Sequence, residues 1–218
     1  MLLPDKIPDN QKETELIKRL GTMAFAGVLI YVFLDVMLQM LPPHYSLKQA
    51  ESDLAVGSFG WFMRINFILR SLFSAALIVA IYKAAKNTRL SITGLVFFSF
   101  WSASSFLLAF FNTDVATGIN QIAANTLHGD IHLLLVFIGF ICAPVGIVLV
   151  SASFQNTGYF KSFEMPAMII SILTALAFFY LGLAGIHAAN FGIIERVCIG
   201  LVLGWIAFVG FKLRRYHA

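Results

Sequence analysis

Residues 130–150 read DIHLLLVFIGFICAPVGIVLV, and this stretch decides the fold class of the chain. After Asp130 and His132 it contains no acidic or basic side chain. A helix needs about 20 such residues to cross the roughly 30 Å hydrocarbon core of a bilayer. Because lipid offers no hydrogen-bond partner to an open backbone, a run of this kind is expected to be a transmembrane helix.

Five further apolar runs of similar length are found at residues 20–41, 58–82, 90–111, 166–186 and 192–213. Hydrophobic residues make up 59% of the 218 positions and charged residues only 12%, whereas a soluble domain carries about 25% charged residues. We therefore predict an all-α, polytopic membrane bundle of about six transmembrane helices. The expected parts are an N-terminal segment (1–19) with a short surface helix, a membrane domain (20–213) and a tail (214–218).

The positive charges lie on one side of this predicted bundle. Eleven of the 15 Lys and Arg residues fall in the N-terminal segment, the second and fourth connections and the C-terminal tail. The opposite connections hold only Lys48 and Arg196. Since cytoplasmic loops are enriched in Lys and Arg, both termini are expected in the cytoplasm, with the protein in the plasma or inner membrane. This pattern also explains the net charge of +4, so no nucleic-acid partner is expected.

Acidic residues and histidines gather at the opposite, outer side. Six of the 11 acids and four of the five histidines fall there: Asp35, Glu51, Asp53, Asp114, Asp130, Glu195, His44, His128, His132 and His187. This side of the bundle is therefore the expected functional face.

Two arginines, Arg64 and Arg70, lie inside the second predicted helix. Charges within a membrane helix are costly and are usually paired or face a water-filled cavity. Arg64 and Asp35 share a depth of about 9 Å on neighbouring helices, so an ion pair between them is expected. Arg70 lies deeper and shares a helix face with Asn66. Two interpretations stay open: pairs that stabilise the fold, or a cavity that admits a charged ligand or headgroup.

The segment NTLHGDIH at residues 125–132 predicts the start of a helix. Asn125 or Thr126 can cap this helix, and Asp130 in its first turn is favoured by the helix dipole. The polar connection before it, residues 111–127, is expected to be an interfacial helix or lid, or a plain loop. Pro144 removes one backbone donor inside the helix and is expected to kink it.

His128 and His132 stand one turn apart in this predicted helix, a spacing at which two imidazoles reach one metal ion. His187 or Asp114 is the candidate third ligand, and zinc is the expected metal. The alternative is that these histidines are hydrogen-bonded parts of the scaffold.

Signatures of several other chemistries are absent from the sequence. It contains no H-E-x-x-H, no G-x-S-x-G and no lysine in the interior of a predicted span that could form a Schiff base, since Lys212 lies at the very end of its span. Haem or quinone redox chemistry is a further alternative, and a bis-haem bundle needs paired histidines on facing helices, for which only His132 and His187 could serve. Cys142 and Cys198 lie in apolar runs and are expected to be small buried hydrophobes.

Four short motifs carry a family resemblance: ESDLAVGSFGWFMR at 51–64, FNTD at 111–114, HGDIH at 128–132 and IIER at 193–196. They resemble a family of prokaryotic integral membrane proteins catalogued as domain of unknown function 998, over about residues 20–213. The resemblance implies a compact helical bundle and no particular activity. A looser likeness to the zinc amide hydrolases of the alkaline ceramidase and adiponectin-receptor type implies no residue roles, because helix number and motif spacing differ.

We therefore expect an outer-facing polar pocket that binds a lipid headgroup or a small solute, with membrane lipid as a partner. Its expected residues are Asp35, Glu51, Asp53, Arg64, Asn66, Arg70, Asp114, Glu195 and Arg196. The alternative is a membrane-embedded, metal-dependent hydrolase at the same face. In that case the metal ligands would be His128, His132 and His187, with Asp114 as ligand or general base.

Overall fold

The computed structural model describes residues 11–41, 46–115, 126–185 and 188–217. These residues form seven α-helices and two short 3-10 helices, and they contain no strand. Six of the α-helices are long and apolar enough to cross a membrane, which confirms the all-α prediction and the six spans. They are α1 (Gln11–Met40), α2 (Gly60–Ala84), α3 (Arg89–Leu108), α4 (Leu127–Ser153), α6 (Glu164–Ala184) and α7 (Phe191–Leu213). The short elements are η1 (Glu51–Ala55), η2 (Phe154–Asn156) and α5 (Gly158–Lys161).

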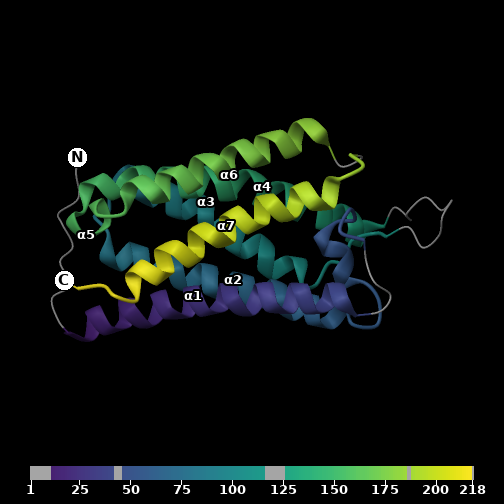
Figure 1. Cartoon of the computed structure of the whole chain (residues 1–218), viewed down its shortest axis with the longest axis horizontal. Helices are drawn as coiled ribbons and strands as arrows, with labels where there is room; N and C mark the ends of the chain where they lie inside the picture. The colour runs from purple at the N-terminus through teal and green to yellow at the C-terminus, as the bar shows by residue number, and fades with distance from the viewer. Residues whose placement is uncertain (1–10, 42–45, 116–125, 186–187, 218) are drawn as a thin grey trace.

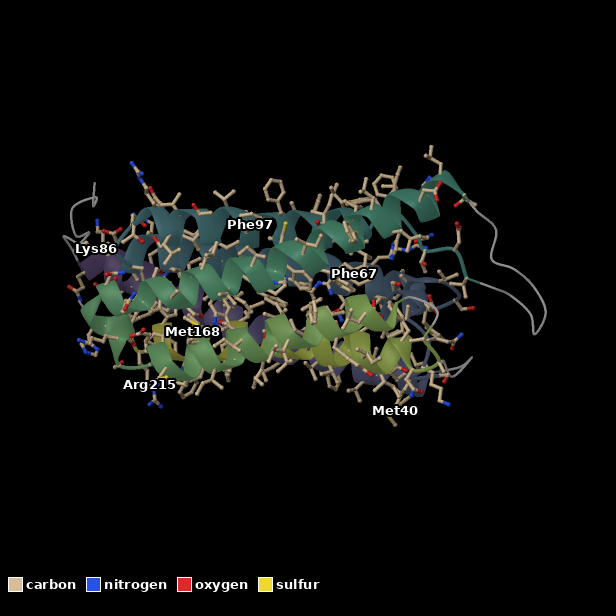
Figure 2. All side chains as sticks on the ribbon, turned by 90° about the horizontal axis from the view of Figure 1, so that it is seen from above. Met40, Phe67, Lys86, Phe97, Met168 and Arg215 are labelled. Atoms are coloured by element: carbon tan, nitrogen blue, oxygen red, sulfur yellow. The ribbon has the colours of Figure 1, made fainter. Side chains whose placement is uncertain are left out.

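The six long helices run side by side along the long axis of the molecule (Figure 1), and their contacts close a ring in chain order. Each helix packs against its neighbours along the chain, and α7 closes the ring by packing against α1. The first turn of α1 and the last turn of α7 lie at one end of the bundle, which we call the terminal end, and η1 lies at the other, the η1 end. Oxygen and nitrogen atoms gather at the two ends, while mostly carbon covers the middle (Figure 2). This distribution is the one that a bilayer imposes on a spanning bundle.

Helix α1 differs most from its predicted bounds, because it begins at Gln11 without a break between a surface helix and a span. Residues 11–20 contain no proline or glycine that would end a helix there. Ile17 is fully buried in the core, and Glu13 accepts a hydrogen bond from Lys83 of α2 at 3.1 Å. These contacts hold the polar first turns of α1 against the bundle.

Helix α4 begins at Leu127, three residues before the predicted span. The side chain of Thr126 accepts a hydrogen bond from the backbone nitrogen of Gly129 at 3.1 Å. Asp130 lies in the first turn. The predicted cap is therefore confirmed for Thr126. The preceding residues 116–125, and with them most of the predicted lid, lie outside the described part of the chain.

Small residues allow neighbouring helices to approach closely. A Cβ at Gly146 of α4 would lie 2.7 Å from the backbone nitrogen of Phe98 in α3, and one at Gly94 would lie 2.8 Å from the nitrogen of Val150. Close backbone approach of this kind supplies much of the attraction between helices in lipid, because no hydrophobic effect drives them together there. The α3–α4 crossing therefore depends on glycine.

Hydroxyl groups also join the helices inside the ring. Ser71 of α2 and Ser102 of α3 lie 3.3 Å apart, and Ser151 of α4 and Ser171 of α6 lie 2.8 Å apart, each pair by its Oγ atoms. Trp205 of α7 donates to Ser151 at 2.9 Å. Both cysteines are buried, as predicted, and they are not joined in a disulfide. Such interhelical hydrogen bonds fix the rotation of each helix about its own axis.

Candidate functional site

Four adjacent helices each present a pair of polar or aromatic side chains near the η1 end. Residues four apart lie one above the other on the same face of a helix. The pairs are Tyr31 and Asp35 on α1, Asn66 and Arg70 on α2, Trp101 and Ser105 on α3, and His128 and His132 on α4. The expectation that Asn66 and Arg70 share a face is confirmed, and both are buried.

Arg70 is at the centre of the site and is only 3% exposed. Its Nε donates to the hydroxyl of Ser105 at 2.8 Å, and its Nη1 donates to the hydroxyl of Tyr31 at 3.2 Å. The guanidinium carbon lies 4.6 Å from the centre of the Trp101 ring. Arginine keeps its charge in proteins, so this site holds a buried, permanent cation. The ion pairs found among the described residues lie at the terminal end and do not involve Arg70.

Glu51 of η1 is the carboxylate linked most directly to this cation. It is 3% exposed, and its Oε1 accepts a hydrogen bond from the Tyr31 hydroxyl at 2.5 Å. The same hydroxyl accepts the hydrogen bond from Arg70, so one oxygen atom separates the guanidinium from the carboxylate. The second carboxylate oxygen of Glu51 is buried with no hydrogen-bond partner in the described part of the chain.

The start of α7 holds η1 and the residues before it in place. Glu195, also 3% exposed, accepts a hydrogen bond from the backbone nitrogen of Glu51 at 2.7 Å. Arg196 donates from Nη1 to the carbonyls of Leu47 at 3.2 Å and Gln49 at 2.7 Å. These contacts fix Glu51 above the interior of the ring. They also show that Arg196 binds backbone carbonyls instead of a carboxylate.

Several buried polar atoms around Arg70 have no hydrogen-bond partner among the described residues. They are Asp35 Oδ1, Glu51 Oε2, Asn66 Oδ1, Trp101 Nε1 and His132 Nε2. Asp35 and His132 both lie within electrostatic range of Arg70. Folded proteins satisfy nearly all of their buried polar groups, and leaving one unsatisfied costs about 1–3 kcal/mol. A group of five in one place is therefore unusual.

The predicted ion pair between Asp35 and Arg64 is wrong. No ion pair joins these two described residues, and the Nε of Arg64 is buried without a partner in that part of the chain. Asp35 instead lies within electrostatic range of Glu51, Arg196 and Arg70. The position of a residue along a helix gives its depth in the bundle, but it does not give the direction in which its side chain points. Arg64 and Arg70 are six residues apart, so they point about 120° away from each other around α2.

Asp53 is half-buried in η1, outside the spanning helices. Burial raises its pKa to about 6, and the nearby charge of Arg196 opposes this shift without cancelling it. The carboxyl group of Asp53 therefore changes charge close to neutral pH, unlike an exposed aspartate.

Asp114 anchors the beginning of α4. One carboxylate oxygen accepts from the backbone nitrogen of Thr126 and the other from its hydroxyl, both at 2.8 Å. These two hydrogen bonds hold the pKa of Asp114 below its usual value, so the group stays ionised at neutral pH. Because both oxygens have partners, the contacts assign Asp114 a positioning role at the start of α4.

The histidines occupy two different environments. His132 is 1% exposed, and its Nδ1 lies 2.8 Å from the carbonyl oxygen of Phe111. Since a carbonyl only accepts, Nδ1 carries the proton in the neutral ring and Nε2 is left as an acceptor. His128 is exposed, with its ring centre 5.5 Å from that of Phe111. His187 lies outside the described residues, which by themselves contain no group of three or more His, Cys, Asp or Glu placed to hold a metal ion.

Sequence reasoning missed the neutral members of the site. Tyr31, Trp101 and Ser105 carry no charge and lie in predicted spans where aromatic side chains and hydroxyl groups are common. The available signal was periodicity, because Tyr31 precedes Asp35 by one turn and Trp101 precedes Ser105 by one turn. Their importance follows only from the way that α1, α2 and α3 face one another.

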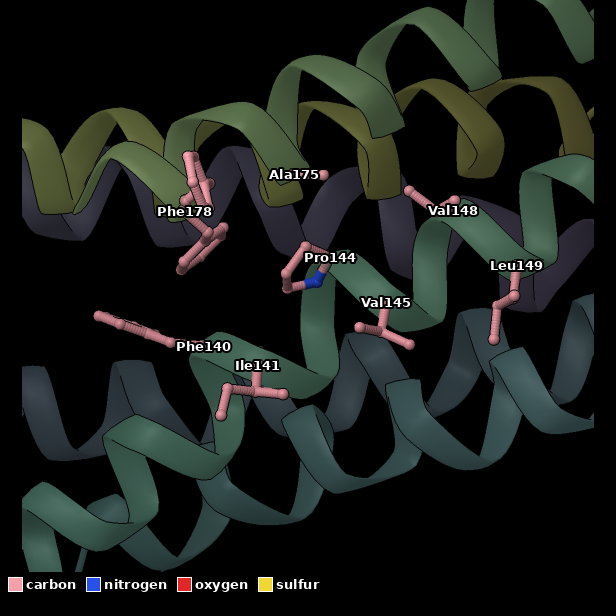
Figure 3. Close-up of a pocket in the computed structure, with 9 residues that line it drawn as sticks. Phe140, Ile141, Pro144, Val145, Val148, Leu149, Ala175 and Phe178 are labelled. Atoms are coloured by element: carbon pink, nitrogen blue, oxygen red, sulfur yellow. The ribbon is translucent and has the colours of Figure 1, made fainter. Parts of the chain in front are cut away.

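A separate apolar groove of about 460 Å³ lies between α4 and α6 (Figure 3). Its lining includes Phe140, Pro144 and Phe178, and it contains no charged side chain. The ring of Pro144 therefore lines this groove in the spanning part of α4. The groove contributes nothing polar to the site around Arg70.

The fold and the site together define a multi-pass α-helical membrane protein with a buried, charged cluster at one end of its bundle. The chain belongs to the family described as protein of unknown function (DUF998), whose model matches residues 25–212. The resemblance seen in the short sequence motifs is thereby confirmed. No curated protein and no solved structure matches the chain.

Proposed function

We propose that this protein binds an anionic group, carried by a lipid headgroup or a small solute, at Arg70 in the interior of the bundle. The observation that carries the proposal is a buried guanidinium whose hydrogen bonds within the described part of the chain go only to neutral hydroxyls. A buried charge without a direct ion-pair partner is costly, and this cost is greatest inside a membrane domain. Glu51 reaches Arg70 only through the Tyr31 hydroxyl, so an anionic ligand would supply the direct ion pair that Arg70 lacks among the described residues.

The hydrogen bonds of Arg70 leave one side of its guanidinium available. Nε and Nη1 are used by Ser105 and Tyr31, whereas Nη2 has no partner among the described residues. The indole nitrogen of Trp101 is a second unused donor next to the guanidinium. Guanidinium and indole N–H groups together suit the oxygens of a phosphate or carboxylate, and charge-assisted hydrogen bonds of this kind are strong.

The sidedness of the site belongs to the same proposal. Lys86, before α3, and Arg215, after α7, lie at the terminal end (Figure 2), and Arg89 and Arg214 are near them in the sequence. By the positive-inside rule this end faces the cytoplasm, so the η1 end faces outward in a plasma or inner membrane. The ligand would then enter from the outer leaflet or from the outer solution.

The proposal is tested by ligand-dependent thermal stability of the purified protein in detergent. Inorganic phosphate and a short-chain phosphatidic acid are the probes, and Arg70→Gln is compared with Arg89→Gln. Arg89 is exposed at the terminal end, so its substitution removes the same charge away from the site. A probe at about 100 times its Kd stabilises a protein by about 2.7 kcal/mol. We expect this shift in the wild type and in Arg89→Gln, and its loss in Arg70→Gln.

The proposal fails if neither probe stabilises the wild type, or if Arg70→Gln responds as the wild type does. Should Arg70→Gln not fold, Trp101→Phe provides the second variant, because it removes only the indole donor. Its apparent Kd for phosphate should rise by about tenfold, the equivalent of one lost hydrogen bond of about 1.4 kcal/mol.

A metal-dependent hydrolase is the second proposal. It is favoured by His132, whose Nδ1 is held by the Phe111 carbonyl while Nε2 stays unused, the arrangement typical of a metal-ligating histidine. It requires zinc and further ligands, with His128 and His187 as candidates. Elemental analysis and zinc titration test it, and a folded protein that takes up no zinc would refute it.

A further inference from the structure

Resting on the proposed anion site, we infer that the ligand is a compact zwitterion whose primary ammonium group binds Glu51 and Asp35 while its phosphate binds Arg70. Three features of the described residues carry this inference: two unused carboxylate oxygens, the local excess of negative charge, and the short separation between the acidic and the basic group.

The unused oxygens belong to two carboxylates beside Tyr31. Glu51 accepts the Tyr31 hydroxyl through Oε1 and has a buried Oε2 without a partner in the described part of the chain. Asp35 lies one turn after Tyr31 on α1, and its Oδ1 is likewise buried and unpartnered there. Asn66, whose Nδ2 donates to the Tyr31 carbonyl at 3.1 Å, adds a third unused acceptor through Oδ1. Three acceptors match the three N–H donors of a primary ammonium group.

The charge balance also favours a cation on this side of the site. Asp35 and Glu51 lie within electrostatic range of each other, and neither forms an ion pair with any described residue. The nearest basic group on α7, Arg196, is directed to the carbonyls of Leu47 and Gln49. Arg70 reaches Glu51 only through the Tyr31 hydroxyl, so an ammonium group between the two carboxylates would be their direct counter-ion and would remove their mutual repulsion.

The spacing of the charges indicates a small molecule or headgroup. One hydroxyl oxygen, that of Tyr31, stands 2.5 Å from Glu51 and 3.2 Å from Arg70. A ligand that reaches both groups therefore carries its ammonium and its phosphate a few bonds apart. Phosphoethanolamine, free or as a lipid headgroup, has this structure. A choline group has no N–H donor, so it would leave the buried acceptors unsatisfied.

The experiment compares probes that share a phosphate group and carry a primary amine, a quaternary amine or no amine. Phosphoethanolamine, phosphocholine and inorganic phosphate represent free solutes, and the short-chain phosphatidylethanolamine, phosphatidylcholine and phosphatidic acid represent lipids. Apparent Kd values are measured from thermal shifts of the purified full chain in detergent. We expect ethanolamine compounds to bind at least about tenfold more tightly than their choline counterparts, which corresponds to about 1.4 kcal/mol. Glu51→Gln should bring this ratio towards one, whereas Asp130→Asn, an exposed acid at the same end, should leave it unchanged.

Each outcome separates this inference from the proposed function. If phosphate and phosphatidic acid bind through Arg70 but the amine makes no difference, the zwitterion is refuted and the anion site stands. If no phosphate compound binds in an Arg70-dependent way, the proposed function itself fails. Stronger binding of the lipid probes would identify a headgroup, and equal or stronger binding of the free probes a solute, and both support the zwitterion. Should Glu51→Gln not fold, Asp35→Asn takes its place, since the Asp35 side chain makes no hydrogen bond with the described residues.

Discussion

Removal of one hydroxyl group, in Tyr31→Phe, should destabilise the whole η1 end. The Tyr31 side chain is 1% exposed, and its hydroxyl takes part in two hydrogen bonds with charged groups, one to Glu51 and one from Arg70. Each such bond contributes about 1.5–3 kcal/mol net, and phenylalanine supplies neither. Some of the loss is recovered if water enters, so we expect about 3 kcal/mol. For a chain of this size that corresponds to a fall in Tm of about 6–12 °C.

The measurement is thermal unfolding of purified protein in detergent, followed by intrinsic tryptophan fluorescence. Tyr180→Phe is the matched control, because Tyr180 is 59% exposed on the outside of α6 and the same atom is removed. The control should change Tm by less than about 2 °C, as surface substitutions usually do. Equal, small effects of the two substitutions would refute the claim that the Tyr31 hydroxyl connects Glu51 and Arg70. A double variant with Glu51→Gln should lose less than the sum of the single variants, since the two groups interact.

Three further predictions concern packing, pH and orientation. Gly146→Leu should destabilise the α3–α4 crossing by about 1–3 kcal/mol in the same assay, whereas Gly182→Ala, where nothing lies within 4 Å of the added Cβ, should be neutral or stabilising. Because the pKa of Asp53 is raised to about 6, its contribution to stability is complete below pH 4 and is lost as the pH rises through 6. Tm measured from pH 4 to 7 should therefore fall more in the wild type than in Asp53→Asn, and equal slopes would contradict the assignment. With both native cysteines replaced by alanine, Ser58→Cys should react with an impermeant maleimide on intact cells and Arg215→Cys only after permeabilisation; the reverse pattern would invert the proposed topology.

Part of the site could be predicted from sequence because charges are rare inside membrane helices. Arg70 and Glu195 are conspicuous in apolar surroundings, and both prove to be buried at the η1 end. The cap of α4 by Thr126 was also predictable, since capping depends on residues three apart in the chain. The Asp35–Arg64 pair could not be predicted correctly, because it depends on the rotation of two helices about their axes.

What the sequence by itself determined is therefore the set of spanning helices and the end of the bundle at which charge gathers. Both follow from the cost of placing polar groups in lipid, which acts on each segment separately. Only the tertiary structure decided that a tyrosine hydroxyl lies between Arg70 and Glu51, and that Asp114 binds Thr126. Those contacts join residues from different elements, and helix packing with its close glycine crossings selects which faces meet.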